Sequence, residues 1–94
     1  MLPIDPETGE IPDVSIQEKA RIIFRNLSAI AKQANVTLNH AVKTTVFLTD
    51  INDFKSVNEV YEQYFSASLS KWSAFQAAAL HLGAQIEVGA IFQI

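Results

Sequence analysis

One stretch constrains the fold of this chain more than any other. It runs from Ala41 to Thr49 and reads AVKTTVFLT. It is rich in β-branched residues, and its side chains alternate between two faces, as in a strand. One face carries Val42, Thr44, Val46 and Leu48, and the other carries Lys43, Thr45, Phe47 and Thr49. Such a strand requires a second layer of secondary structure packed against one of its faces.

A helical pattern precedes this strand. Ser15 to Glu18 (SIQE) is a capping box, in which the Ser hydroxyl and the Glu carboxylate can each satisfy a free amide of the first turn. The apolar residues that follow are three or four positions apart: Ile16, Ala20, Ile23, Leu27, Ile30 and Ala34. This spacing predicts an amphipathic helix of about five turns, which Asn35 can end in a left-handed conformation.

A second helix is predicted after the strand. Residues 50–53 (DIND) supply capping side chains. The apolar stripe of this helix consists of Phe54, Val57, Tyr61, Tyr64 and Phe65. On its solvent side, Lys55 and Glu59 have the spacing of an i,i+4 ion pair.

Two more strands are predicted near the C-terminus, over residues 72–80 and 85–92, joined as a hairpin by residues 81–84. Near the N-terminus, a short strand ending at Ile4 leads into a turn from Asp5 to Gly9. The order β-α-β-α-β-β predicts a single α+β domain over residues 1–94, a small sheet with two helices on one face.

The other face of that sheet has no predicted cover. It carries Phe47 and Ile91 beside small residues, and a chain of 94 residues has no further element to place there. Burial against other copies of the chain is the economical solution, so we expect a homo-oligomer.

Composition excludes several classes of function. The chain has no cysteine, which rules out disulfides, thiolate metal sites and a Cys nucleophile. His40 and His81 lie far apart, with no metal-type neighbour at helical spacing. A net charge of −3 argues against a large phosphate-binding surface, so a nucleic-acid partner is not expected. Residues 1–13 lack the basic and apolar regions of a secretory signal, and no apolar run could cross a bilayer, so a cytoplasmic protein is expected.

The run VKTTVFLTDINDFKSVNEVYEQYF, from Val42 to Phe65, resembles the central signature of the RidA (YjgF-like) family. IDPETGEI resembles the stretch before that family's first helix, and SAFQAAAL with GAQIEVGAI resembles its C-terminal strands. The resemblance implies a chorismate-mutase-like fold (bacillus type) in a homotrimer with clefts between subunits. It also implies hydrolysis of reactive 2-imino acids and their enamine tautomers to 2-oxo acids and ammonia, without cofactor or metal.

The family's site residues transfer only in part. Glu87, in QIEVG, matches the Glu that positions water as a general base or orienting group. Asn58, in SVNEVY, matches a pocket-lining Asn on the second helix. The family's carboxylate-binding Arg belongs to a Pro-Ala-Arg-Ser pattern. The sequence here is Ser70-Lys71-Trp72-Ser73, so Trp72 stands in the Arg position and Lys71 precedes it.

Other positions also depart from the family pattern. His81 replaces the usual Pro after the penultimate strand, and Gly89 stands where a second acidic residue is often found. The family's N-terminal strands are expected to be missing except for their last residues, Leu2 to Ile4. Trp72 offers one neutral donor, and Lys71 should project from the opposite face of the strand. Loss of a preorganised charged donor costs about two to three decades in rate.

Each site residue also has a structural interpretation. Trp72 can fill apolar volume at a subunit contact, and Glu87 can be a solvated surface residue. Asn58 can brace a neighbouring loop, and His81 can be an exposed loop residue. The sequence therefore predicts a RidA-like protein of weakened or absent deaminase activity. The alternatives are a non-catalytic trimeric module that binds small carboxylated or apolar ligands and, more weakly, a ribonuclease or translation inhibitor.

Overall fold

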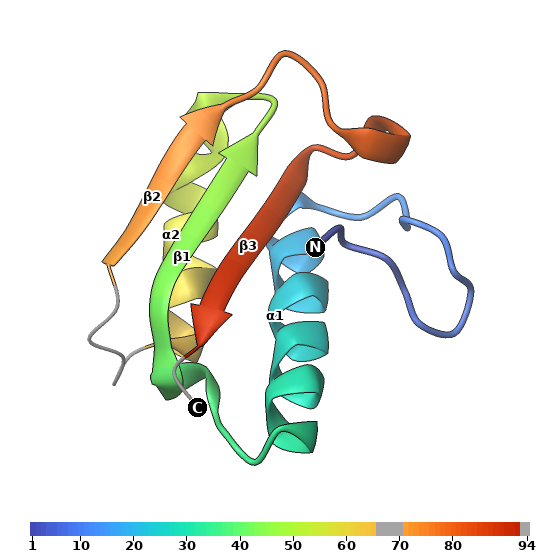
Figure 1. The fold of residues 1–94 in the computed structure, drawn as a ribbon. Helices are drawn as coiled ribbons and strands as arrows, with labels where there is room; N and C mark the ends of the chain where they lie inside the picture. The colour runs from blue at the N-terminus through green and yellow to red at the C-terminus, as the bar shows by residue number, and fades with distance from the viewer. Residues whose placement is uncertain (66–70, 93–94) are drawn as a thin grey trace.

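The computed structural model describes residues 1–65 and 71–92. Its helices and strands are α1 (Ile16–Gln33), β1 (Ala41–Leu48), α2 (Phe54–Tyr64), β2 (Lys71–Gln76) and β3 (Ile86–Phe92). Both helices cover the same face of the sheet (Figure 1), which confirms the predicted α+β class. Within the described residues, no helix combines the length and the apolar character needed to cross a bilayer.

The sheet has the strand order β2-β1-β3 and is mixed, since β1 pairs in parallel with β2 and antiparallel with β3. The predicted hairpin between the last two strands is therefore wrong. The β-branched strand β1 takes the central position and uses both of its edges. To allow this, β2 ends at Gln76 rather than at residue 80, and the chain crosses the end of β1. Backbone bonds from Ala77 to Leu48 (2.8 Å) and from Thr49 to Gln85 (3.1 Å) hold that crossing.

The core lies between β1, β3 and the two helices. Its fully buried residues include Ile23 and Phe24 of α1, Val46 and Leu48 of β1, and Val57 of α2. The predicted stripe of α1 is correct up to Leu27 and wrong beyond it. Ile30 and Ala34 are exposed, whereas Ala31 is buried.

Phe24 explains the shift of the buried stripe of α1. Its ring centre lies 5.9 Å from Tyr61, 5.6 Å from Tyr64 and 5.5 Å from Phe65, all on or next to α2. Phe24, one position beyond the predicted Ile23, therefore faces α2, and both residues are fully buried. On α2 itself, Val60 is buried and Phe54 is exposed.

The face assignment of β1 is correct from Thr44 onward. Thr44, Val46 and Leu48 are buried beneath the helices. Val42 is 51% exposed because the pairing with β3 shifts register between Ala41 and Lys43. Such an irregularity moves the residues before it to the other face.

The predicted helix ends are partly confirmed. Ser15 accepts the Glu18 amide at 3.1 Å, and Asn35 adopts the left-handed conformation with φ 60°. The Glu18 carboxylate binds Arg21 and Arg25 instead of returning to the cap. The predicted ion pair between Lys55 and Glu59 is wrong, since it does not form among the residues that the structure describes.

Glu59 binds a residue of the other helix. Its carboxylate accepts the Gln17 side-chain amide at 3.0 Å, which ties α1 to α2. At the N-terminus no strand forms, but Met1 exchanges two backbone hydrogen bonds with Val88 on the outer edge of β3.

Thr44 is the one buried polar side chain among the described residues whose oxygen has no hydrogen-bond partner. We predict that Thr44→Val, which keeps the shape and removes the unpaired hydroxyl, raises the free energy of unfolding by about 1 kcal/mol. Urea denaturation followed by the fluorescence of the single Trp measures this. Thr45→Val, on the opposite face of the same strand, is the control and should change stability by less. Destabilisation by Thr44→Val would contradict the unpaired state of its hydroxyl.

Candidate functional site

Glu87 lies on the face of the sheet that the helices leave uncovered. Its neighbours in β3, Ile86 and Val88, are buried, so the carboxylate points to the opposite side. Glu87 is half-buried and pairs directly with Phe47 of β1. Phe47 in turn pairs with Phe75 of β2. The carboxylate therefore stands at one end of a row that two aromatic side chains complete.

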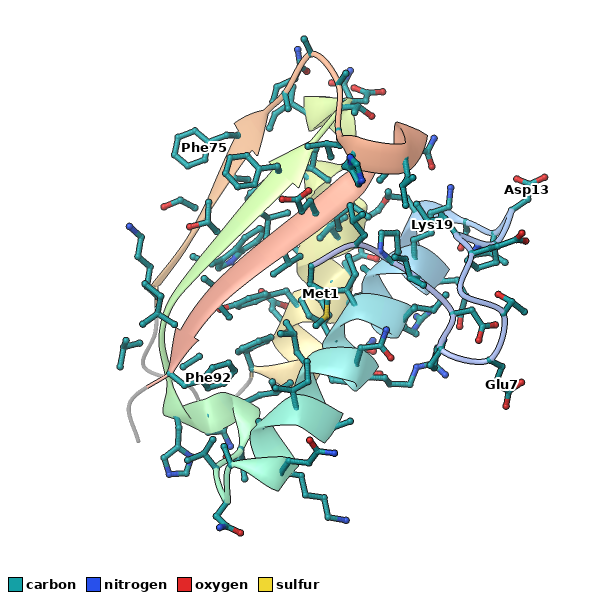
Figure 2. All side chains as sticks on the ribbon, turned by 45° about the vertical axis from the view of Figure 1, so that its right-hand side comes forward. Met1, Glu7, Asp13, Lys19, Phe75 and Phe92 are labelled. Carbon is teal, nitrogen blue, oxygen red and sulfur yellow. The ribbon has the colours of Figure 1, made fainter. Side chains whose placement is uncertain are left out.

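The two aromatic rings of this row contact each other. Their centres are 6.1 Å apart and their planes are tilted by 31°. Phe75 is 54% exposed and projects away from both helices, as Figure 2 shows. Phe75 is not among the site residues that the sequence predicted. Alternation from Trp72 would have placed it on the face opposite Trp72, but only the strand pairing shows that it shares a row with Glu87.

The next row of this open face consists of small residues. Thr45 pairs with Ser73 on one side and with Gly89 on the other. Gly89 has open space where a side chain would lie. The row beside Glu87 therefore carries only small side chains, with one hydroxyl each from Thr45 and Ser73 as its polar groups. The row beyond contains Lys43 and Ile91.

Trp72 lies on the other face of the sheet, beneath the helices. It pairs with the buried Thr44, and its ring stacks on Phe54 and Tyr61 of α2. The centre of the Trp72 ring lies 4.9 Å from that of Phe54 and 4.7 Å from that of Tyr61, and the interplanar angles are 7° and 20°. Phe65 continues the stack at 4.3 Å from Tyr61. The indole is thus a half-buried packing element between β2 and α2.

Asn58 lies on α2, half-buried, and its side-chain amide donates to Glu62 at 3.3 Å. This bond runs along the helix and does not brace a neighbouring loop. Asn58 is less buried than Val57 and Val60 of the same helix.

Three of the four predicted site residues lie on different sides of the sheet within one chain. Trp72 and Asn58 belong to the helix-covered side of the sheet, and Glu87 belongs to the open side. Lys71 begins β2, but its side chain lies outside the described part of the structure. His81 is exposed in a short 3-10 turn, not in a hairpin. Across the described ranges, no group of three His, Asp or Glu residues could hold a metal ion.

Comparison with known proteins identifies the family. The family model described as Endoribonuclease L-PSP matches residues 1–94. The chain is 43% identical over 88 residues to 2-iminobutanoate/2-iminopropanoate deaminase of Mus musculus. The aligned region covers 94% of this chain. The chain spans only 65% of the length of that relative.

Solved structures agree with this assignment. The YjgF gene product of E. coli has a TM-score of 0.89 and 37% identity, over 97% of this chain and 73% of that one. E. coli TdcF with bound serine has a TM-score of 0.88 and 38% identity, over 97% of this chain and 73% of its own. The predicted resemblance to the RidA (YjgF-like) family is confirmed.

The stacked position of Trp72 has a measurable consequence. We predict that Trp72→Ala lowers the free energy of unfolding by about 2–4 kcal/mol, because it removes ring contacts with Phe54 and Tyr61 and leaves a cavity. Trp72→Phe keeps one ring in the stack and should cost less than half as much. Thermal denaturation followed by circular dichroism compares the two. Equal stability of Trp72→Ala and the unmodified protein would contradict the packing role.

Proposed function

The chain belongs to the Endoribonuclease L-PSP family, and we propose that it is a RidA-like protein of the 2-imino acid deaminase class, with weakened activity. The reaction converts a 2-imino acid and water to a 2-oxo acid and ammonia. One observation carries the proposal: Glu87, the only carboxylate in the described part of the open face, stands at the end of a row with Phe47 and Phe75. Beside it lies a row of small residues that offers the hydroxyls of Thr45 and Ser73.

The chemistry requires a group that takes a proton from water. The substrate reacts as the protonated imine. As water attacks its carbon, Glu87 accepts one proton of the water, which leaves a neutral adduct with one hydroxyl and one amino group. Glu87 then returns this proton to the amino group, the C–N bond breaks to release ammonia, and the hydroxyl proton leaves to the ammonia as the carbonyl of the 2-oxo acid forms. The adjacent ring of Phe47 excludes water from one side of the carboxylate, which strengthens its interactions in the site.

Binding of the substrate carboxylate limits the proposed activity, because this group needs a cationic partner. By the resemblance, Trp72 stands at the position of the family's Arg, and its ring faces the helices. On the described part of the open face, the cation on β1 is Lys43, four residues from Phe47, so about 13 Å away along the strand. That separation is too great for one small imino acid to contact both Lys43 and Glu87. Without a paired donor the reaction should be slower by a factor of about 10²–10³.

We predict that the protein accelerates the hydrolysis of 2-iminopropanoate only slightly and that Glu87→Gln removes this acceleration. The Gln keeps the shape of the side chain but cannot accept a proton from water. The imino acid is generated by an upstream enzyme, and pyruvate formation is followed with and without the protein. Glu7→Gln, an equal change of charge on an exposed loop, should leave the rate unchanged.

Trp72→Arg tests the proposed cause of the weak activity. A faster rate in this variant would support the missing guanidinium as the limiting factor, provided that the variant remains folded. Rapid hydrolysis of 2-iminopropanoate by the unmodified protein would contradict the proposal of weakened activity.

The alternative is a non-catalytic module that binds small carboxylated or apolar ligands on the same face. The exposed Phe75 favours this alternative, since an aromatic surface can bind apolar ligands without any chemistry. The alternative would be favoured if the unmodified protein binds such a ligand but does not accelerate hydrolysis, and if Trp72→Arg changes neither result. Ribonuclease or translation-inhibitor activity is supported by the family description alone, and the net charge of −3 argues against it. The cytoplasmic location remains a prediction from composition.

A homotrimer is part of the proposal. Phe75 and Ile91 are 54% and 58% exposed on the open face, and no described element covers them. Closing three sheets on one another would bury these side chains and place the groups of a neighbouring chain near Glu87. A cleft between chains would thus complete a site that one chain does not contain.

We predict that the protein has three times the mass of one 10.4 kDa chain in solution, and that Phe75→Asp converts it to a monomer. A buried unpaired carboxylate at the contact would cost more than the contact gains. Light scattering coupled to size exclusion measures the mass. Leu82→Asp is the matched control, since Leu82 is 65% exposed but lies outside the sheet. A stable monomer of the unmodified protein would contradict the trimer.

A further inference from the structure

A second candidate site lies on the side of the molecule that carries α1, away from Glu87. A cavity of about 440 Å³ opens between the N-terminal loop and the outer side of α1. The loop contributes Asp5, Pro6, Pro12 and Val14, and the helix contributes Glu18, Ile22, Arg25 and Asn26. We propose that this cavity binds a small organic ammonium ion with a branched apolar body, either a free amine or the amino end of an amino acid.

The loop that forms the outer wall is held in place before any ligand binds. The Asp5 amide donates to Glu10 at 2.9 Å, and the Gly9 amide donates to Asp5 at 2.8 Å. Gly9 supplies the left-handed turn with φ 73°, a conformation that glycine adopts without strain. Asn26 of α1 donates its side-chain amide to the Ile4 carbonyl at 3.0 Å. A wall fixed in this way loses little conformational entropy on binding.

Two oxygens of the lining have no protein partner among the described residues. Asp5 Oδ1 accepts the Glu7 amide at 2.8 Å, which leaves Oδ2 unused. Asn26 uses its amide nitrogen on Ile4, which leaves the amide oxygen unused. Both side chains are half-buried. An ammonium group, with three donors and no acceptor, matches this pair of unused acceptors.

The charges of the lining also favour a cation. Glu18 accepts Arg21 at 3.1 Å and Arg25 at 2.8 Å, and these guanidinium groups hold the pKa of its carboxyl below the ordinary value. Arg25 is therefore already paired with Glu18. Asp5 is the charged side chain of the lining that has no ion-pair partner among residues 1–65 and 71–92. A cationic ligand neutralises Asp5, whereas an anionic ligand would be repelled by it.

The remaining lining is apolar and rigid. Pro6, Pro12, Val14 and Ile22 present hydrocarbon surface, and the two prolines have fixed φ angles. The volume lies within the range of small-molecule sites. A branched alkyl group would fill it, with its ammonium directed at Asp5 and Asn26.

The test is a titration of the full 94-residue protein with isoamylamine, leucine and isovalerate, followed by amide chemical shifts in ¹H–¹⁵N spectra. We expect isoamylamine to shift the amides of residues 5–14 and 18–26 in a saturable manner, and isovalerate to leave them unchanged. Binding of leucine as tightly as isoamylamine would identify the amino end of an amino acid as the ligand. Binding of isoamylamine alone would identify a free amine.

Asp5→Asn isolates the charge, because the Asn oxygen can still accept the Glu7 amide. It should weaken the binding of isoamylamine about tenfold. The matched control is Glu7→Gln, the same change of charge on the same loop. Glu7 lies outside the cavity lining and projects outward, as does Asp13 (Figure 2). An equal loss in both variants, binding of isovalerate as strong as that of isoamylamine, or no saturable shift would each overturn the proposal.

Discussion

The pairing of β1 along both of its edges is the constraint on which the rest of this structure depends. Thr44, Val46 and Leu48 must lie under the helices, because they form the buried face of the central strand. The side-chain period of a strand is two, so Phe47 is then forced onto the opposite face. The strand pairing adds Phe75 and Glu87 on either side of it. Burial of the core and exposure of the candidate site are thus two results of one alternation.

The same alternation separates Trp72 from Glu87. Trp72 pairs with Thr44, so its ring enters the layer between sheet and helices and stacks on α2. There an indole adds apolar contact where a guanidinium would need to reach a charged partner. Because Trp72 lies on the helix-covered face, any site containing Glu87 must draw its other groups from the open face or from a second chain.

The sequence predicted local features well where a short-range interaction determines them. Ser15 caps α1 and Asn35 ends it, because both roles need only the neighbouring backbone. It failed where another side chain competes for the same group, or where packing between helices decides the contact. Glu18 binds two arginines of its own helix rather than its cap, and Phe24 packs against the aromatic side chains of α2. The hairpin failed for a related reason, because adjacency in sequence does not reveal that both last strands pair with β1.

The sequence by itself determined the family, the α+β class and the order of the two helices and three strands from Ile16 onward, since each of these follows from residue identity or from the period of a strand or helix. Only the tertiary structure decided which residues share a row with Glu87, where Trp72 packs, and that the N-terminal loop encloses a cavity against α1. These are contacts between residues far apart in the chain. They depend on strand register and on the rotation of each helix about its axis, which are set by packing rather than by local pattern.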